Sequence, residues 1–252
     1  MRRLERELVP AARSPASTRT VVSPRIAASR AMPAPVIPPP ITSRSCGVAA
    51  SLLSAARTKG EVLVSIAPAG RIARPSTWFT WHEYLIRPGT RVLDFACGEG
   101  RHGLAAAARG ASVVAVDRDG AALETGRELA EAHGLTIDWR VVDLEGPWPA
   151  LGTFDAVLMF NYLDRARVPQ VLELVAPGGV LLMETYLVTQ RQLGWGPSRD
   201  DHLLAPGELA RLVAPLRVMH GREVLEPVDV ERWRAVASIV AEQRAREPLP
   251  ER

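Results

Sequence analysis

Four residues in a short stretch of this sequence have the types and spacing of a ligand-binding pocket. Asp94 stands four positions before Gly98, Gly100 follows, and Asp117 lies 19 positions after Gly98. Glycines lack a Cβ and let the backbone approach a ligand closely. A carboxylate at the end of the next strand can accept hydrogen bonds from ribose hydroxyls. This arrangement predicts a pocket for an adenosine-containing cofactor.

The charges around the glycines favour one such cofactor over another. Residues 98–103 read GEGRHG, which matches the dinucleotide-binding pattern G-x-G-x-x-G, but this short pattern alone is weakly specific. Carboxylates at Asp94 and Glu99 would repel the pyrophosphate of a nicotinamide cofactor, whereas they would attract the cationic sulfonium and amine of S-adenosylmethionine (SAM). We therefore expect SAM, with an NAD(P)-dependent Rossmann oxidoreductase as the alternative.

Alternating strands and helices are needed to bring these residues together. Short apolar runs suit buried parallel strands, and alanine-rich or amphipathic stretches between them suit helices. The expected strands are 91–96, 112–116, 137–142, 154–160 and 179–185, with two more near 217–221 and 234–240. The expected helices are 78–85, 101–109, 120–133, 166–175 and 206–214. This order predicts a doubly wound α/β fold, although the pattern of 233–242 alone also allows a helix.

Five successive motifs resemble those of the class I SAM-dependent methyltransferases, over Thr77 to Glu242. They read VLDFACGEG, AVDRD, VVDLE, FDAVLMFNY and LVAPGGVLLMET. Residues 161–162, 184–186 and 197–209 are similar to bacterial small-molecule methyltransferases of the tellurite-resistance type. The resemblance implies a Rossmann-like, mostly parallel seven-stranded sheet that ends in an antiparallel pair. It also implies methyl transfer from SAM to a small-molecule acceptor.

The resemblance further implies which residues hold the cofactor. The carboxylate of Asp94 and the backbone of 96–100 would hold the methionine amine, and Asp117 would hold the ribose. Asp143 and Leu144 would read the adenine edge, and the carbonyl of Phe160 would lie beside the sulfonium. The full expected set is Asp94, Ala96, Gly98, Gly100, Asp117, Arg118, Asp143, Leu144 and Phe160. Two alternatives stay open, namely that Asp117 caps the following helix and that Asp143 is a turn residue.

The residues expected to face the methyl acceptor are Asn161, Tyr186 and His202. Asn161-Tyr162 lacks the prolines of the N-P-P-Y motif, which argues against methylation of a base or amide nitrogen. Tyr186 could instead pack under a lid formed by 187–204, and His202 could simply be exposed. Because no strong general base accompanies the motifs, we expect an acceptor that is already nucleophilic, such as a thiolate, a chalcogen oxyanion or a carboxylate. A non-catalytic SAM-binding module is a second alternative function.

Charge and proline content divide the chain near residue 75. Residues 1–75 carry 12 Lys/Arg against 3 Asp/Glu and 10 of the 21 prolines, whereas 76–252 has a net charge of −6. We expect residues 1–75 to be a disordered or low-complexity extension, with a targeting segment as the alternative. Residues 76–252 are expected to form the methyltransferase domain.

Composition also bears on compartment and partners. No apolar run approaches the ~18 residues of a membrane span, and the two cysteines, Cys46 and Cys97, are poorly placed for a structural disulfide, which favours the cytoplasm. The acidic domain shows no basic, aromatic-laced stripe for nucleic acid, and no His, Cys and Asp cluster has metal-ligand spacing. We expect a small-molecule substrate, no metal, no nucleic-acid or membrane partner, and a monomer or homodimer.

Overall fold

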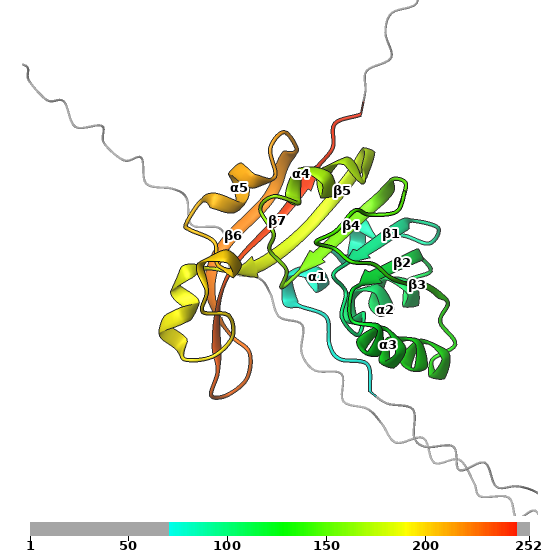
Figure 1. Cartoon of the computed structure of the whole chain (residues 1–252), viewed down its shortest axis with the longest axis horizontal. Coiled ribbons are helices and arrows are strands. Elements are labelled where there is room, and N and C mark those ends of the chain that lie inside the picture. The colour runs from blue at the N-terminus through cyan, green and yellow to red at the C-terminus, as the bar shows by residue number, and fades with distance from the viewer. Residues whose placement is uncertain (1–70, 246–252) are drawn as a thin grey trace, which may run out of the picture. The chain divides into compact units, whose positions relative to one another are not determined.

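A seven-stranded sheet organises the part of the chain that the structure describes. The computed structural model describes residues 71–245, and the strand order is β3-β2-β1-β4-β5-β7-β6 (Figure 1). The strands are β1 (Arg91–Phe95), β2 (Ser112–Asp117), β3 (Ile137–Val141), β4 (Phe154–Phe160), β5 (Val175–Tyr186), β6 (Arg217–Pro227) and β7 (Trp233–Glu242). The helices are α1 (Thr77–His82), α2 (Arg101–Ala108), α3 (Gly120–Ala132), α4 (Val168–Glu173) and α5 (Glu208–Leu212). The predicted seven-stranded, mostly parallel α/β sheet is confirmed.

The strands that carry the glycine loop lie at the centre of the sheet. β1 pairs in parallel with β2 on one side and with β4 on the other. Val92, Leu93 and Phe95 of β1 are completely buried, as continuous apolar runs in doubly covered parallel sheets should be. All carboxyl ends of these strands therefore meet at one edge, where ligands bind in open α/β sheets.

β7 runs opposite to both of its neighbours. It pairs with β5 from Val180↔Glu242 to Tyr186↔Val236 and with β6 along its other side. Partners on both sides explain why residues 233–242 form a strand although their pattern alone also allowed a helix. The antiparallel β7 also separates this sheet from the all-parallel dinucleotide-binding Rossmann sheet, which argues against the NAD(P) alternative.

Several element boundaries differ from the predicted ones. β5 begins at Val175, not at residue 179, because an irregular register against β4 lets Phe154 pair with Val175. This earlier start shortens α4, and α5 is likewise shorter than its predicted range. The lead-in helix ends at His82 and continues as a 3-10 turn, η1 (Glu83–Leu85). These differences arise where pairing and packing with distant residues decide the structure.

Two apolar layers cover the sheet. On one face, α1 and α2 pack through Trp78, Phe79 and Ala106 onto residues of β1, β4 and β5. On the other face, α4 and α5 pack through Val171 and Leu209 onto the same strands and β7. Burial of these side chains on both faces supplies the main stabilisation of the domain.

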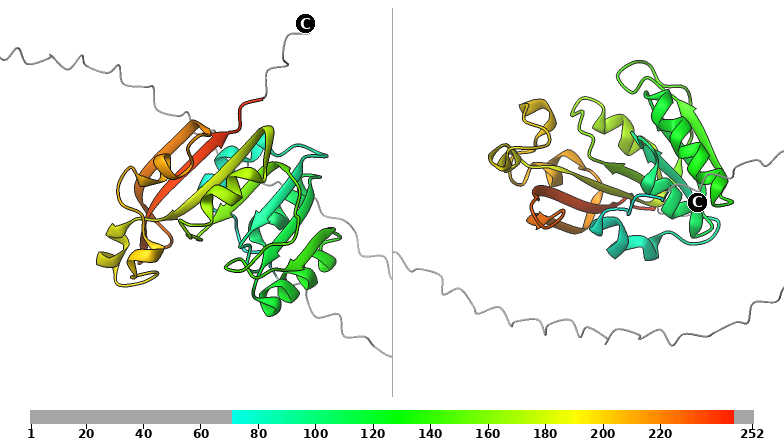
Figure 2. Two further views of the ribbon diagram at one scale, coloured as in Figure 1. Left: turned by 45° about the horizontal axis from the view of Figure 1, so that its top comes forward. Right: turned by 90° about the horizontal axis from the view of Figure 1, so that it is seen from below.

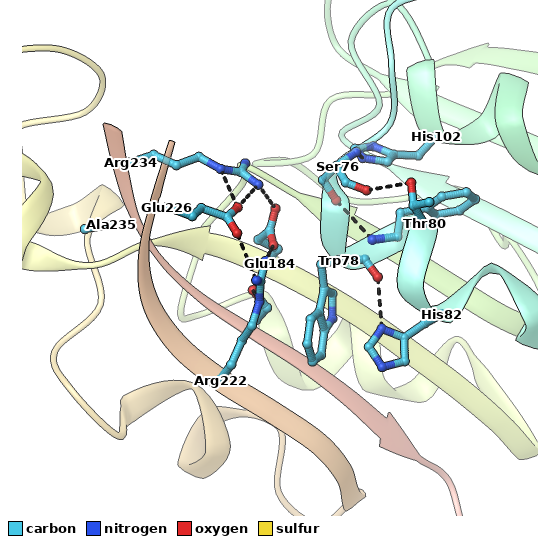
Figure 3. Close-up of polar contacts among 12 residues, drawn as sticks. Ser76, Trp78, Thr80, His82, His102, Glu184, Arg222, Glu226, Arg234 and Ala235 are labelled. Atoms are coloured by element: carbon cyan, nitrogen blue, oxygen red, sulfur yellow. Dashed lines mark hydrogen bonds and ion pairs between the residues drawn. The ribbon is translucent and has the colours of Figure 1, made fainter. Parts of the chain in front are cut away.

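Four charged side chains form a buried network across β5, β6 and β7 (Figure 3). Glu184 is fully buried, and its carboxylate lies 3.2 Å from Arg222 Nη2 and 2.9 Å from Arg234 Nη2. Glu226 lies 2.8 Å from Arg222 Nη1 and 2.5 Å from Arg234 Nη2, and Ser238 Oγ donates to Glu184 Oε2 at 2.8 Å. Because each charge has an opposite partner, the network offsets the desolvation of all four groups.

The segment between β5 and α5 crosses the carboxyl edge of the sheet as two 3-10 turns, η2 (Val188–Leu193) and η3 (Asp200–His202). It lies beside the turn between β6 and β7 in both views of Figure 2. Trp195 Nε1 donates to the carbonyl of Trp233 at 2.8 Å, and the side-chain amide of the buried Gln190 bonds to the backbone of Trp195 and Ala235. Within residues 71–245, no helix has the length and apolar character to cross a membrane.

Candidate active site

The glycine loop turns sharply between β1 and α2. Ala96, Gly98 and Gly100 have φ values of 56°, 55° and 72°, a region that costs little only for glycine. A Cβ on Gly100 would lie 2.4 Å from the Trp139 ring, so position 100 must be glycine. Ala96 has no such freedom, and its strained backbone lies at the edge of a cavity, where strain often accompanies function.

Asp94 is a buried carboxylate at the end of β1. Its side chain is 1% exposed, and its Oδ2 accepts a hydrogen bond from the Gly103 amide at 2.7 Å. Burial, opposed in part by this hydrogen bond, raises the pKa of Asp94 to about 7. A Cβ on Gly103 would lie 2.9 Å from that oxygen, so the glycine allows α2 to approach the carboxylate. A cation at this position would complete the pairing of Asp94.

Asp117 ties the end of β2 to the glycine loop. Its Oδ2 accepts from the Gly98 amide at 2.8 Å and its Oδ1 from the Asp119 amide at 3.0 Å. The helix cap of α3 is Asp119, which accepts from Ala121 and Ala122, so the alternative that Asp117 caps this helix is wrong. A carboxylate has about four acceptor sites, and Asp117 therefore keeps capacity for ligand hydroxyls.

A cavity of about 340 Å³ joins these groups. Its walls are Asp94, Ala96, Cys97, Gly98, Arg101, His102, Asp117, Phe160, Asn161 and Tyr162. Two carboxylates beside a glycine loop suit the ammonium and ribose of SAM, and they oppose a pyrophosphate. Burial raises the pKa of the Cys97 thiol, so this cysteine stays protonated and is a wall rather than a nucleophile. The residues present therefore fit SAM.

His102 and Phe160 form the floor of this smaller cavity. Their rings stack with centroids 3.9 Å apart, and His102 Nε2 accepts from the Ser76 amide at 3.2 Å. Burial, with the nearby charges of Arg101 and Arg234, lowers the pKa of His102 well below its ordinary value. The imidazole of His102 is neutral, only 3% exposed and hydrogen-bonded to the start of α1. Its role is therefore to hold α1 in place, not to transfer a proton.

A larger cavity of about 680 Å³ adjoins the smaller one along the carboxyl edge of the sheet. It contains all three residues predicted to face the acceptor, Asn161, Tyr186 and His202. Asn161 has a φ of 58°, a second strained backbone position at a strand end. Tyr186 meets Trp195 edge to face with centroids 6.4 Å apart, so this ring is wedged between the cavity and the 188–202 segment. His202 is exposed, on η3.

Seven of the nine predicted cofactor residues line one or both cavities, and Gly100 and Asp143 line neither. Arg118 and Leu144 line the larger cavity, and Gly100 supplies the turn beneath the smaller one. Asp143 is exposed, lines neither cavity, and accepts from the Glu145 amide at 3.0 Å. This is the turn geometry that the sequence left open, and a role for Asp143 at the adenine stays a prediction.

Four charged residues of the larger cavity were missed in the sequence. They are Glu145, Asp164, Arg165 and Asp201. Asp164-Arg165 could have been found as a charged pair just beyond a parallel strand, but Glu145 and Asp201 lie in loops whose position the sequence does not specify. Glu145 pairs with Arg118 at 2.8 Å, with both side chains about two-thirds exposed, so this surface pair contributes little stability.

The charges of this cavity bear on its ligand. Four carboxylates line it against two guanidinium groups. Arg118 pairs with Glu145 of the same wall, and Arg165 pairs with Glu208, which lies outside it. Tyr162 OH is buried without a hydrogen-bond partner among the described residues; burial, followed by the charges of Asp164 and Glu145, raises the pKa of Tyr162 to about 12. A wall of this charge disfavours the anionic acceptors expected from the sequence.

No group of three or more His, Cys, Asp or Glu within 71–245 is arranged to hold a metal ion.

Comparisons with known proteins agree with this geometry. Residues 92–179 match the protein family described as "Methyltransferase domain". A ubiquinone biosynthesis O-methyltransferase from Methylocella silvestris is 35% identical over 153 residues, which are 52% of this chain and 59% of that protein. The chain spans from about a third to just under two thirds of the length of the curated relatives it matches.

Two solved structures share the fold. TehB from Haemophilus influenzae is 20% identical with a TM-score of 0.54, over 66% of this chain and 61% of that one. A SAM-dependent methyltransferase from Methanosarcina mazei is 16% identical with a TM-score of 0.54, over 69% of this chain and 100% of that one. The methyltransferase domain matched over residues 92–179, the sheet order with its antiparallel β7 and the acid-flanked glycine loop all agree with the fold of the class I SAM-dependent methyltransferases.

Proposed function

We propose that this protein transfers a methyl group from SAM to a small-molecule acceptor bound in the larger cavity. The observation that carries the proposal is that the two cavities share four wall residues, Ala96, Asp117, Asn161 and Tyr162. A cofactor in the smaller cavity and an acceptor in the larger one would therefore meet at the carboxyl ends of β1 and β4. Ala96 and Asn161, the two non-glycine residues with positive φ within 71–245, lie at this junction.

The residues that would hold the cofactor follow from the smaller cavity. Asp94 would pair with the ammonium, Asp117 would accept from the ribose, and Leu144 would cover the adenine. When bound, SAM supplies a methyl group on a positively charged sulfur, which is a good leaving group without further activation. The main work left to the chain is to align the acceptor and to exclude water.

The larger cavity supports a neutral or cationic acceptor. Glu145 and Asp201 already pair with Arg118 and Arg199. Asp164 has no ion-pair partner among the described residues, so its carboxylate would favour a cation over an anion. Asn161 and Tyr186 would orient the acceptor, and His202 is the imidazole on this wall that could accept a proton from it. The 188–202 segment would shield this contact from solvent, with Trp195 behind Tyr186.

Calorimetric titration tests the cofactor half of the proposal. We expect SAM and S-adenosylhomocysteine to bind and NADH to fail. Asp117→Asn should weaken SAM binding by about 1 to 3 kcal/mol, because it leaves a buried polar contact imperfectly paired. Asp119→Asn is the matched control, since it caps α3 and lines neither cavity. Equal SAM affinity in wild type and Asp117→Asn would contradict the assignment.

Turnover separates a catalyst from a non-catalytic SAM-binding module. The protein, SAM and fractionated metabolite extracts should yield S-adenosylhomocysteine and one methylated small molecule. With that acceptor, we expect Tyr186→Phe and His202→Ala each to lower turnover modestly, because both side chains line the larger cavity. Tight SAM binding without product from any fraction would favour the non-catalytic module.

A monomeric or homodimeric state and a cytoplasmic location remain predictions from the sequence.

A further inference from the structure

Arg165, on the loop after β4, makes an unusual set of contacts. Its Nε donates to Glu208 Oε1 at 2.6 Å and its Nη2 to Glu208 Oε2 at 3.1 Å, a bidentate ion pair. The same guanidinium donates to the carbonyl of Leu203 at 2.7 Å and to that of Asp201 at 3.2 Å. One side chain thus holds the backbone on both sides of His202.

Few other contacts fix this stretch. In the described part of the chain, the other polar contacts of residues 199–202 come from the segment between β5 and α5. The His202 amide donates to the Arg199 carbonyl at 3.1 Å, and Arg199 pairs with Asp201. Arg191 of η2 also forms an ion pair with Asp200. Asp200, Asp201 and His202 are exposed, so apolar burial does not fix them either. The next residues are anchored independently of Arg165, since Leu203 is 1% exposed and the Leu204 amide bonds to the carbonyl of Tyr186 at 2.8 Å.

Glu208 is itself held in place at the start of α5. Its Oε2 accepts from the Ala205 amide at 2.7 Å, and the hydrogen bond from Arg165 lowers the pKa of Glu208. The Glu208 side chain is only 18% exposed. A partly buried, charge-assisted, bidentate pair is among the more rigid polar contacts that a surface segment can have.

We propose that Arg165 is a positioning residue that sets His202 against the acceptor cavity by clamping residues 201–203 to Glu208. The clamp joins the loop after β4, which carries Asn161, to the segment that carries His202, so both walls of the cavity move together. This proposal rests on the proposed function, because it assigns His202 to the acceptor site. Arg165 acts through the backbone of the segment and need not touch the acceptor.

Amide hydrogen exchange of the full-length protein tests the clamp without an acceptor. Arg165→Lys keeps the positive charge but cannot make the bidentate pair with Glu208 and the carbonyl hydrogen bonds together. We therefore expect the amides of His202 and Leu203 to exchange at least about tenfold faster. Amides of β4 and β5 should be unchanged, and the Kd for SAM should stay within about twofold. Arg167→Lys is the matched control, because Arg167 contacts Gln170, the Glu145 carbonyl and the Trp148 ring, and none of residues 200–208.

A second readout reports His202 directly. In a histidine-selective NMR spectrum, the His202 ring resonance should move towards its random-coil position in Arg165→Lys and not in Arg167→Lys, while His102 and His133 stay in place. Glu208→Gln should give a smaller change, and the double variant should exchange no faster than Arg165→Lys alone, since both act on one contact.

Two results would overturn the clamp. One is equal exchange at His202 in Arg165→Lys and Arg167→Lys. The other is faster exchange spread over β4 and β5, which would make Arg165 a general structural residue. Either result leaves SAM binding and turnover to be judged separately, and an absence of turnover in wild type would contradict the proposed function while leaving the clamp measurable.

Discussion

Asp94 shows how a single buried side chain can couple cofactor binding to proton release. Its carboxyl group has one hydrogen-bond donor, the Gly103 amide, and almost no contact with solvent. The protonated form is therefore favoured in the free protein up to a pH of about 7, far above the ordinary value of 3.8. A cationic ligand in the smaller cavity would reverse this preference and favour the carboxylate.

We predict that SAM affinity rises with pH up to about 7 and then levels. Below this pH, binding must expel the Asp94 proton, which costs up to about tenfold in affinity per pH unit. Calorimetry at pH 6 in two buffers of different ionisation enthalpy should detect close to one proton released per SAM bound. In Asp94→Asn the affinity should be lower and independent of pH over this range.

The same raised pKa has a defined sign for folding. Between pH 4 and 7 the unfolded chain loses the Asp94 proton while the folded chain keeps it, so the contribution of this group to the free energy of unfolding falls as pH rises. This contribution should be constant above about pH 7.

A wild-type protein with pH-independent SAM affinity from pH 5.5 to 7.5 would show that Asp94 does not contact the cation.

At this scale the sequence predicts residues whose roles are set by strand ends. Asp94, Gly98 and Asp117 lie next to a strand or its turn, and the parallel sheet brings them to one edge. Asp201 could not be found in this way, because its place depends on a contact with Arg165, which lies on a loop distant in sequence. The left-handed backbone of Asn161 likewise has no signal in its residue type.

At the scale of elements, α2, α3 and the glycine loop meet around Trp139 of β3. Gly126 is the point of closest approach, since a Cβ there would lie 2.6 Å from the Trp139 ring and 2.7 Å from the Glu99 carbonyl. Gly120, at the start of the same helix, has room for a Cβ, with Val141 Cγ2 at 3.6 Å as its nearest neighbour. The two glycines of α3 therefore differ in why they are glycine.

We predict opposite effects of alanine at these two positions. Gly120→Ala should raise the free energy of unfolding by up to about 1 kcal/mol, because alanine favours helix. Gly126→Ala should lower it by about 1 to 3 kcal/mol, because overcrowding outweighs the helix preference. Gly126→Ala should also weaken SAM binding, since it displaces the carbonyl of Glu99 in the glycine loop. Urea unfolding and calorimetry measure both effects, and a stabilised Gly126→Ala would contradict the packing.

Elements with their own apolar pattern could be predicted well from the sequence. β4 was expected at 154–160 and lies at Phe154–Phe160. The edges of β5 and the identity of β7 could not be derived from local pattern, because pairing with strands far along the chain decides both. Only the resemblance to a family supplied the antiparallel ending.

At the scale of the whole molecule, the packed core of the described residues extends from Ser76 to Glu242. Ser76 caps α1 and donates to His102, and α1 buries Trp78 and Phe79 against the sheet. The predicted extension at 1–75 lies, apart from residues 71–75, outside the described residues. The boundary near residue 75 therefore stays a prediction that truncation can test.

We predict that a chain starting at Arg71 unfolds at the same urea concentration as the full chain and binds SAM with the same Kd. A chain starting at Glu83 lacks α1 and should unfold readily, because removal of buried Trp78 and Phe79 costs about 3 to 5 kcal/mol each. The chain starting at Glu83 is the control that shows the assay detects a damaged core. Weakened SAM binding in the chain from Arg71 would show that residues before it contribute to the site.

The reversed direction of β7 has a practical consequence for attaching this protein to a surface. Glu242 pairs with Val180 near the start of β5, and the Gln243 amide donates to the Gly179 carbonyl at 2.9 Å. The chain thus leaves the sheet at the edge opposite the ends of β4 and β5, where both cavities open. A biosensor tether placed after residue 245 would leave both openings towards the liquid, whereas one placed just before Ser76 would crowd the smaller cavity.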